Sequence, residues 1–196
     1  MSRTIRYLTH PQVNIDPDIP VPSWSLSEIG RTRIDRLAAS GVLRGTRHII
    51  SSAETKAIQT AAPLAEALGL AVEIRQDMHE NDRSATGFLP PDEFEATADL
   101  FFANPSRSIR GWEPAIDAQT RIVAEVRACL EKHPVGDILF VGHGGVGTLL
   151  YCHLAGHPIS RAFDQGQGGG GCVFDFSGPD SRPLSHWRPL ETLFST

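Results

Sequence analysis

The sequence predicts an α/β protein, a three-layer α/β/α sandwich built around a mostly parallel sheet. Along the 196 residues, short apolar runs alternate with longer segments of helical periodicity, which is the order that strand-helix-strand units with parallel strands produce. The run Ile138-Leu-Phe-Val141 contains four consecutive large apolar residues and is typical of a strand buried on both faces. Neither the length nor an internal repeat requires a second core, so we expect residues 1–196 to form a single domain.

The first half of the chain contains three expected strands separated by two expected helices. The strands are expected at 3–9, 47–52 and 70–75. A first helix begins after Ser27 and ends before Gly41, because serine and glycine are common caps at these two ends of a helix. A second helix is expected at 53–69 with Ser52 as its N-cap.

The second half continues the alternation of helices and strands after a loop rich in turn-forming residues. In order, we expect that loop at 76–91, helices at 91–103 and 114–132, a strand at 137–145, a helix at 146–156, a glycine loop at 168–171, and short strands at 172–177 and 186–190. Ligands of such sheets bind beyond the carboxyl ends of the parallel strands. That edge is therefore where a functional site is expected.

Composition excludes several classes of function. The chain carries 18 basic and 23 acidic residues for a net charge of −5, and its Lys and Arg residues are scattered, so we expect no nucleic-acid partner. No apolar run approaches the roughly 18 residues of a membrane span, and the first residues lack the apolar core of a signal peptide. The three cysteines, Cys129, Cys152 and Cys172, show no CxxC spacing. We therefore expect a cytoplasmic protein with no membrane association.

Polar side chains follow the apolar runs at the expected functional edge. His10, the pair Ser51-Ser52 and His143 each stand at the end of a predicted strand, with Lys56 and Glu80 close by in the sequence. Each alone has a structural explanation, as a cap, a helix charge or a loop acid. Together they suit phosphoryl transfer, because an imidazole can attack phosphorus, cations and helix N–H groups can hold the oxygens, and a carboxyl group can protonate the leaving group. This chemistry needs neither a metal ion nor a cofactor.

Three segments resemble the histidine phosphatase (phosphoglycerate mutase-like) superfamily, and the likeness extends over about residues 4–155. They are "YLTHP", "SSAETKAIQTA" and "FVGHGGVGTLL". The resemblance implies hydrolysis of a small phosphorylated substrate, with His10 as the nucleophile that becomes phosphohistidine, Glu80 as the proton donor and His143 as the second pocket histidine. It also implies that the substrate-binding residues include Thr9, Ser52, Lys56 and Gly144.

The sequence departs from the family pattern at three positions. Thr9 stands where the family has an arginine, Pro11 where it has a glycine, and Lys56 where it has a second arginine. Thr9 can offer the phosphoryl group only a short neutral hydroxyl. Arg83 is a candidate substrate-binding replacement, the alternative being a solvated loop charge. With Lys56, Arg83 and a partly protonated His143 as its only cations, the pocket is expected to be short of positive charge.

Two other functions compete with hydrolysis. The spacing of Cys152, His153 and His157 could suit zinc, but the helix is expected to end at Gly156 and no fourth ligand is evident. A catalytically impaired phosphoester-binding or interaction domain on the same fold is the stronger alternative, because the first arginine is missing. The sequence leaves open the identity of the substrate, the choice between hydrolase and mutase, and the oligomeric state.

Overall fold

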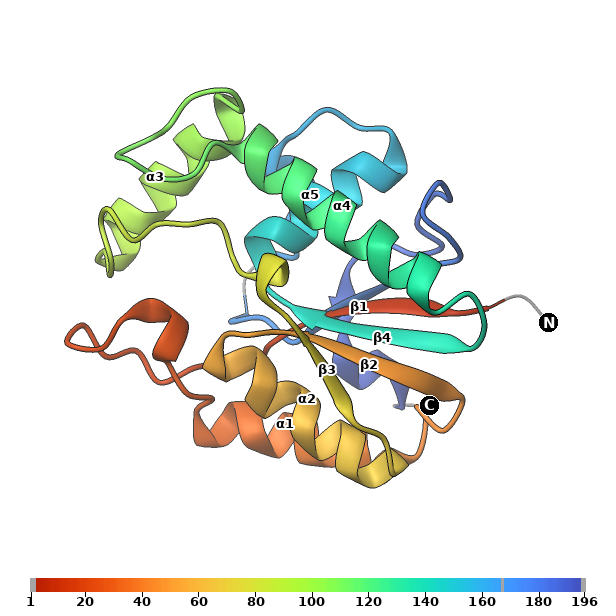
Figure 1. Ribbon diagram of the computed structural model, residues 1–196. Helices are drawn as coiled ribbons and strands as arrows, with labels where there is room; N and C mark the ends of the chain where they lie inside the picture. Colours follow the sequence, from red (N-terminus) through yellow and green to blue (C-terminus); the bar gives the residue numbers. More distant parts are fainter. Residues whose placement is uncertain (1–2, 167, 195–196) are drawn as a thin grey trace.

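A central six-stranded sheet organises the molecule (Figure 1). The computed structural model describes residues 3–166 and 168–194. The strands are β1 (Ile5–Thr9), β2 (Thr46–Ser52), β3 (Val72–Arg75), β4 (Asp137–Gly142), β5 (Cys172–Phe176) and β6 (Arg188–Pro189). They lie in the order β3-β2-β4-β1-β5-β6. Strands β3, β2, β4 and β1 are parallel to one another. Strand β5 pairs antiparallel with β1, and β6 pairs antiparallel with β5. The sheet is therefore mostly parallel, as predicted.

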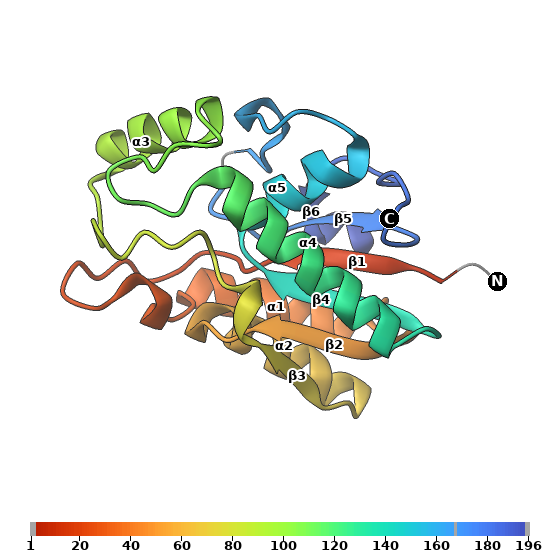
Figure 2. The same cartoon turned by 45° about the horizontal axis from the view of Figure 1, so that its top comes forward.

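Helices cover both faces of this sheet. They are α1 (Glu28–Ser40), α2 (Thr55–Leu68), α3 (Pro91–Ala103), α4 (Ala115–Lys132) and α5 (Gly144–Ala155), with short 3₁₀ turns η1 (Val21–Ser23), η2 (Gln76–Met78), η3 (Arg161–Phe163) and η4 (Leu190–Leu193). In Figures 1 and 2, α1 and α2 lie on one face and α4 and α5 on the other, which confirms the three-layer sandwich. The remaining long helix, α3, stands apart on the side where the parallel strands end.

Two apolar cores, one on each face of the sheet, hold the layers together. Successive side chains of a strand point to opposite faces, so Phe140 of β4 packs in the core under α4 and α5, while its neighbours Leu139 and Val141 pack in the core under α1 and α2. All three side chains are buried. Burial of each such side chain contributes roughly 1.5–3 kcal/mol, which explains why the apolar run of β4 forms the centre of the sheet.

Helix ends follow the caps in the sequence, with two differences. Ser27 accepts a hydrogen bond from Gly30 N at 3.1 Å, and Gly41 ends α1 in the left-handed conformation with φ 71°. The expectation that Ser52 caps α2 is wrong, because Ser52 is still paired with β3 as the last residue of β2, and Glu54 is the N-cap. Helix α5 begins at Gly144, two residues earlier than expected, because the chain turns into the helix directly after β4.

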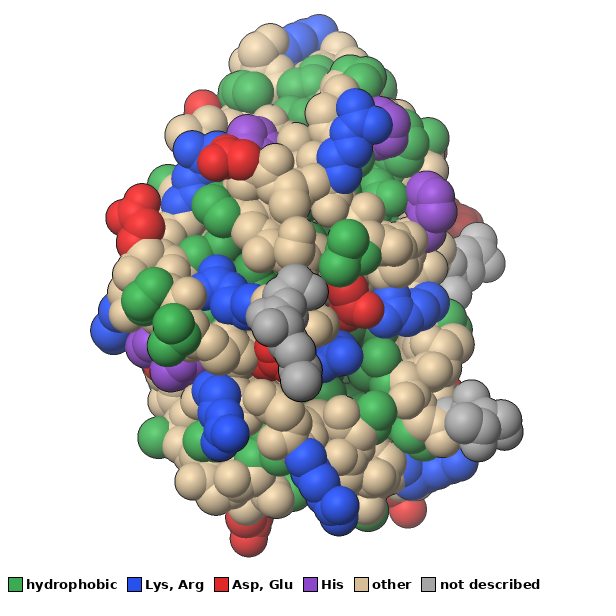
Figure 3. Space-filling model, turned by 90° about the vertical axis from the view of Figure 1, so that its right-hand side faces the viewer, with side chains coloured by type: hydrophobic (Ala, Val, Ile, Leu, Met, Phe, Trp, Pro, Cys, Tyr) green, Lys and Arg blue, Asp and Glu red, His purple; other side chains and the backbone are tan. Residues whose placement is uncertain are grey.

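The surface seen in Figure 3 carries basic and acidic side chains interspersed, as the scattered charges of the sequence suggested. Among the described residues, no helix combines the length and the apolar composition needed to cross a membrane.

Candidate active site

Two histidines meet where the parallel strands β1 and β4 end. The two strands run in register, with Thr9 opposite Gly142, so the residue after each strand emerges at the same edge. His10 N donates to Gly142 O at 2.9 Å, and the rings of His10 and His143 lie 5.3 Å apart between centroids at an interplanar angle of 67°. The sequence placed both histidines at one edge, and the structure brings them together.

His10 presents a free ring nitrogen. Its Nδ1 lies 2.9 Å from the carbonyl oxygen of Pro11. Because a carbonyl oxygen can only accept, Nδ1 must carry the proton, and Nε2 of the neutral ring then keeps its lone pair. Burial, reinforced by the positive charge of Lys56, lowers the pKa of His10 to about 4. At neutral pH the imidazole is therefore uncharged and available as a nucleophile.

His143 is fully buried behind His10 and is also neutral. Its Nε2 lies 2.8 Å from Ser52 Oγ and 3.6 Å from Glu54 Oε1. Burial lowers the pKa of His143 to about 3, although the carboxylate of Glu54 acts in the opposite direction. The expectation of a partly protonated His143 is therefore wrong, because the cost of burying an imidazolium outweighs the attraction of one nearby carboxylate.

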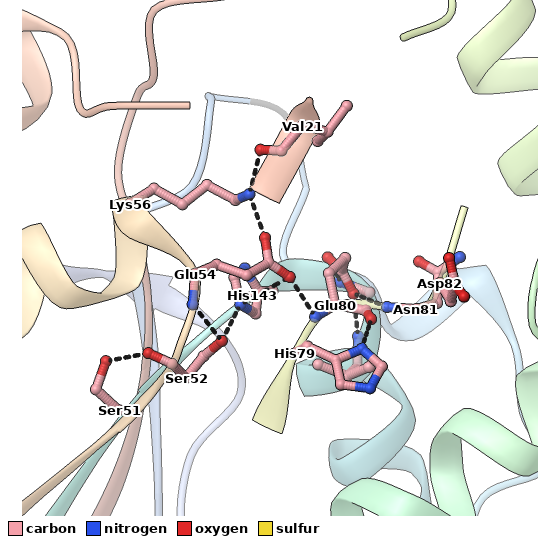
Figure 4. Close-up of polar contacts among 12 residues, drawn as sticks. Val21, Ser51, Ser52, Glu54, Lys56, His79, Glu80, Asn81, Asp82 and His143 are labelled. Atoms are coloured by element: carbon pink, nitrogen blue, oxygen red, sulfur yellow. Dashed lines mark hydrogen bonds and ion pairs between the residues drawn. The ribbon is translucent and has the colours of Figure 1, made fainter. Parts of the chain in front are cut away.

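The ammonium group of Lys56 is engaged by a carboxylate that sequence reasoning missed. Figure 4 shows Lys56 Nζ donating to Glu54 Oε2 and to the carbonyl oxygen of Val21, the latter at 2.9 Å. Both charged side chains are buried, and Lys56 does not line the cavity described below. Burial alone would raise the pKa of Glu54, but His143, Lys56 and the N–H of Glu80 together lower it below its usual range. Lys56 thus forms a buried ion pair instead of a free cation for substrate.

Glu80 closes the N-terminus of α5. Its carboxylate accepts hydrogen bonds from Gly145 N at 3.0 Å and Val146 N at 2.9 Å, where an acid is favoured by the unpaired N–H groups and the helix dipole. A Cβ at Gly145 would lie 2.7 Å from Glu80 Oε1, so a larger residue there would displace the carboxylate. Glu80 also lines the cavity.

Thr9 supports the site from beneath without lining the cavity. Its buried hydroxyl donates to Gln165 Oε1 at 2.7 Å and accepts from Cys172 N at 3.0 Å. Gln165 does line the cavity, and its Nε2 would lie 2.3 Å from a Cβ at Gly144. Direct contact of Thr9 with substrate therefore does not fit the structure, and the amide of Gln165 occupies the space in front of it.

His10 opens onto a cavity of about 860 Å³, whereas His143 does not line it. The wall of the cavity includes His10, Glu80, Asn81, Arg83, Gly144 and Gln165, together with side chains of α3 and its neighbouring loops. Arg83 places its guanidinium carbon 4.9 Å from the ring centroid of Phe94 and 6.0 Å from that of Trp112. Within the described part of the chain, no carboxylate forms an ion pair with Arg83, so this side chain is a cation available to a ligand.

The residues considered for zinc, Cys152, His153 and His157, do not form a cluster of metal ligands. Across residues 3–166 and 168–194, no three His, Cys, Asp or Glu side chains are grouped so that they could hold a metal ion. The thiol of Cys152 is buried and points to the carbonyl oxygen of Ser160, whereas His153 is exposed on α5.

The low pKa values of the two histidines predict a loss of stability in acid. In the unfolded chain both rings bind protons below their ordinary pKa of 6.5, while the folded protein resists protonation. The free energy of unfolding should therefore fall as the pH drops from about 7 to about 4. Urea unfolding should show a smaller fall for His143→Gln than for the wild type, and the exposed His153→Gln should behave like the wild type. An undiminished fall in His143→Gln would contradict the burial argument.

Solved phosphatase structures share this architecture. The native structure of a mycobacterial glucosyl-3-phosphoglycerate phosphatase superposes with a TM-score of 0.75 at 22% identity, covering 96% of this chain and 97% of that chain. Its complex with inorganic phosphate gives a TM-score of 0.74 at 25% identity, with 95% of each chain covered. A mutant phosphoserine phosphatase from Entamoeba histolytica, in complex with phosphoserine, gives 0.74 at 14% identity over 94% of this chain and 96% of that chain. These likenesses confirm the α/β fold, which the chain shares with these phosphatases.

The sequence itself assigns the family. A model of the histidine phosphatase superfamily, branch 1, matches residues 13–179. The chain therefore belongs to the histidine phosphatase superfamily, and its general class is that of a phosphomonoesterase-type enzyme. The match begins just after Thr9-His10-Pro11, the tripeptide in which the sequence departs from the family pattern. No curated protein matches the sequence.

Proposed function

We propose that the protein hydrolyses phosphomonoesters through a phosphohistidine formed on His10. The observation that carries the proposal is the state of this ring, which is neutral, has its Nδ1 proton engaged by Pro11 O, and lies on the wall of a large cavity. A lone pair fixed in orientation at a cavity wall is what an in-line attack on phosphorus requires.

The reaction has two steps. Nε2 of His10 attacks phosphorus, the bond from phosphorus to the ester oxygen breaks, and the departing alcohol oxygen takes a proton from Glu80. Water then attacks the phosphohistidine, giving its proton to Glu80, and inorganic phosphate leaves with the nitrogen–phosphorus bond broken. The carboxylate of Glu80 accepts N–H bonds from the first turn of α5, which places the proton donor at the helix N-terminus.

Neutral donors replace most of the cations expected for the phosphoryl oxygens. The N–H of Gly144 lies at the start of α5, where a helix favours anions. Gln165 and Asn81 border the same cavity, and Asn81 Nδ2 is buried with no hydrogen-bond partner among the described residues. Arg83 adds one guanidinium. This donor set supports phosphate binding with less charge than two arginines would supply.

A non-catalytic phosphoester-binding domain is the second candidate. The pairing of Lys56 with Glu54 favours it, because it leaves little charge to stabilise the transition state. The free nucleophile and the cavity-lining carboxylate oppose it, since binding alone requires neither.

Rapid quenching tests the covalent step. After the protein is mixed with an ester labelled in its phosphoryl group, we expect acid-labile label on His10 that forms and decays at rates consistent with turnover. Peptide mapping at neutral or alkaline pH identifies the labelled residue. Turnover with label on another residue, or with none, would disprove the intermediate, and tight binding of the ester without turnover would favour the binding domain.

A further inference from the structure

The active-site cavity is much larger than a phosphate group needs. Its volume of about 860 Å³ lies in the range of sites that enclose whole small molecules, roughly 300–1,000 Å³. Beyond His10 the wall is built by α3, by the loop that follows Glu80, and by the glycine-rich segment before β5. In Figure 1 helix α3 stands beyond the ends of the strands, and its residues Phe94, Ala98 and Phe101 line the far side of the cavity. The part of a substrate that leaves as alcohol would face this far wall.

The wall beyond His10 combines apolar side chains, several of them aromatic, with charged and polar ones. The apolar side chains are Val13, Ile15, Phe94, Ala98, Phe101, Phe102, Trp112 and Ala162. Ile15 is 61% exposed at the mouth, and Phe94 is only partly buried. Phe101, Phe102 and Trp112 are already buried, so the apolar surface that a ligand would cover belongs mainly to Ile15 and Phe94. Large apolar side chains that remain open to solvent beside a cavity favour an apolar ligand, since each would gain by being covered.

The charges along the wall disfavour a second anionic group on the leaving alcohol. Three carboxylates, those of Glu80, Glu95 and Asp164, line the cavity. Of the two arginines there, Arg161 is already paired with Glu95 and with Asp99 at 2.5 Å. Among described cavity residues, Arg83 is the one guanidinium without a carboxylate partner, and it lies over Phe94 and Trp112. One such cation can serve the phosphoryl group but leaves nothing to neutralise a further charge.

We infer that the substrates are phosphomonoesters of apolar alcohols, above all ring-bearing ones, with no anionic group besides the phosphate. The phosphoryl group would lie at His10 and α5, and the hydrocarbon portion would cover Phe94 and Ile15, the apolar side chains of the wall that remain open. This inference rests on the proposed hydrolysis at His10 and adds to it the class of leaving group.

A matched pair of substrates tests the inference. Both 2-phenylethyl phosphate and glycerol 3-phosphate release a primary alcohol, so they differ mainly in the polarity of the leaving group. We expect kcat/KM to be about tenfold or more higher for the phenylethyl ester, because burial of a ring is worth at least that factor in an apolar pocket. 3-Phosphoglycerate, which adds a carboxylate, should be the poorest of the three. Equal values for the pair, or a preference for the acidic substrate, would overturn the inference.

Variants of α3 test whether this helix determines the preference for the phenylethyl ester. Phe94→Ala should reduce the ratio of the two kcat/KM values about fivefold or more, through a higher KM for the phenylethyl ester. Leu100→Ala is the matched control, because Leu100 lies on the same helix, is 53% exposed and does not line the cavity; its ratio should equal that of the wild type. An unchanged ratio in Phe94→Ala, or equal losses for both substrates, would contradict the assignment of the far wall.

Binding of inert analogues separates this inference from the proposed function. Calorimetry should show tighter binding of 2-phenylethylphosphonate than of 2-hydroxyethylphosphonate, neither of which can lose an alcohol by hydrolysis. Tighter binding of the aromatic analogue without turnover of any ester would disprove hydrolysis but support the apolar site. Turnover of both esters with equal binding of both analogues would support hydrolysis and disprove the apolar site.

Discussion

Replacing His10 with alanine is expected to lower kcat/KM for any phosphomonoester by about 10³-fold or more. The side chain would supply the atom that bonds to phosphorus, so its removal deletes the covalent route instead of weakening one contact. Steady-state release of inorganic phosphate measures the effect. The exposed His153→Ala on α5 is the control and should retain wild-type activity.

Two controls show whether a loss of activity in His10→Ala comes from the missing nucleophile: the stability of the variant and its binding of inorganic phosphate. The variant should unfold near the wild-type urea midpoint and still bind inorganic phosphate, because Gly144, Gln165 and Arg83 remain in place. Activity within about tenfold of the wild type in a folded variant would show that His10 is not the nucleophile.

The sequence could predict the fold because the relevant signals are local. Four consecutive apolar residues predict strand β4, and Ser27 and Gly41 predict the two ends of α1. The edge of the site followed from the same reasoning. Parallel strands carry the residues that follow them to one end of the sheet, so His10 and His143 could be placed together before their contact was known.

The electrostatic state of the site could not be predicted from the sequence, because it depends on burial. Lys56 looked like a pocket cation, and only the packing of η1 and Glu54 around it shows that its charge is engaged. His143 looked like a partly protonated group until its complete burial was known. Gln165 lies next to the glycine tract, more than 150 residues from Thr9 in sequence, and no local pattern announces their hydrogen bond.

One signal for the hidden ion pair was present in the sequence. Glu54 and Lys56 lie two residues apart at the start of α2, close enough to meet where the chain turns from the extended cap into the helix. Charged residues at such a position are ordinarily solvated, so the pair could be recognised only as one possibility among several. The structure shows a buried ion pair instead of two solvated charges, because both side chains are at least nine-tenths buried.

Glu54→Gln is expected to destabilise the protein by about 3–5 kcal/mol. The substitution keeps the shape of the side chain and removes its charge, leaving the ammonium of Lys56, which is 2% exposed, without a carboxylate partner. It also weakens the acceptor for the N–H of Glu80, which bonds Glu54 Oε1 at 2.8 Å. Urea unfolding at pH 7 measures the loss in the free energy of unfolding.

An exposed ion pair provides the matched control. Arg110 and Glu93 lie 3.1 Å apart, with their side chains 46% and 55% exposed, and pairs of this kind contribute about 0–1 kcal/mol. Glu93→Gln should therefore leave the unfolding midpoint nearly unchanged. A similar small loss in Glu54→Gln would contradict the view that the buried pair is needed to accommodate the lysine.

A double substitution shows whether the loss comes from the unpaired charge. Glu54→Leu combined with Lys56→Met replaces both charged groups by apolar side chains of comparable length, and removing a buried pair together is often neutral or stabilising. We therefore expect the double variant to be more stable than Glu54→Gln. Measured together with the single variants Glu54→Leu and Lys56→Met, it should give a coupling energy between the two sites of about 2 kcal/mol or more. If the losses simply add, the destabilisation comes from packing and not from an unpaired charge. Glu54 would then not be the residue that neutralises the positive charge of Lys56 in the site.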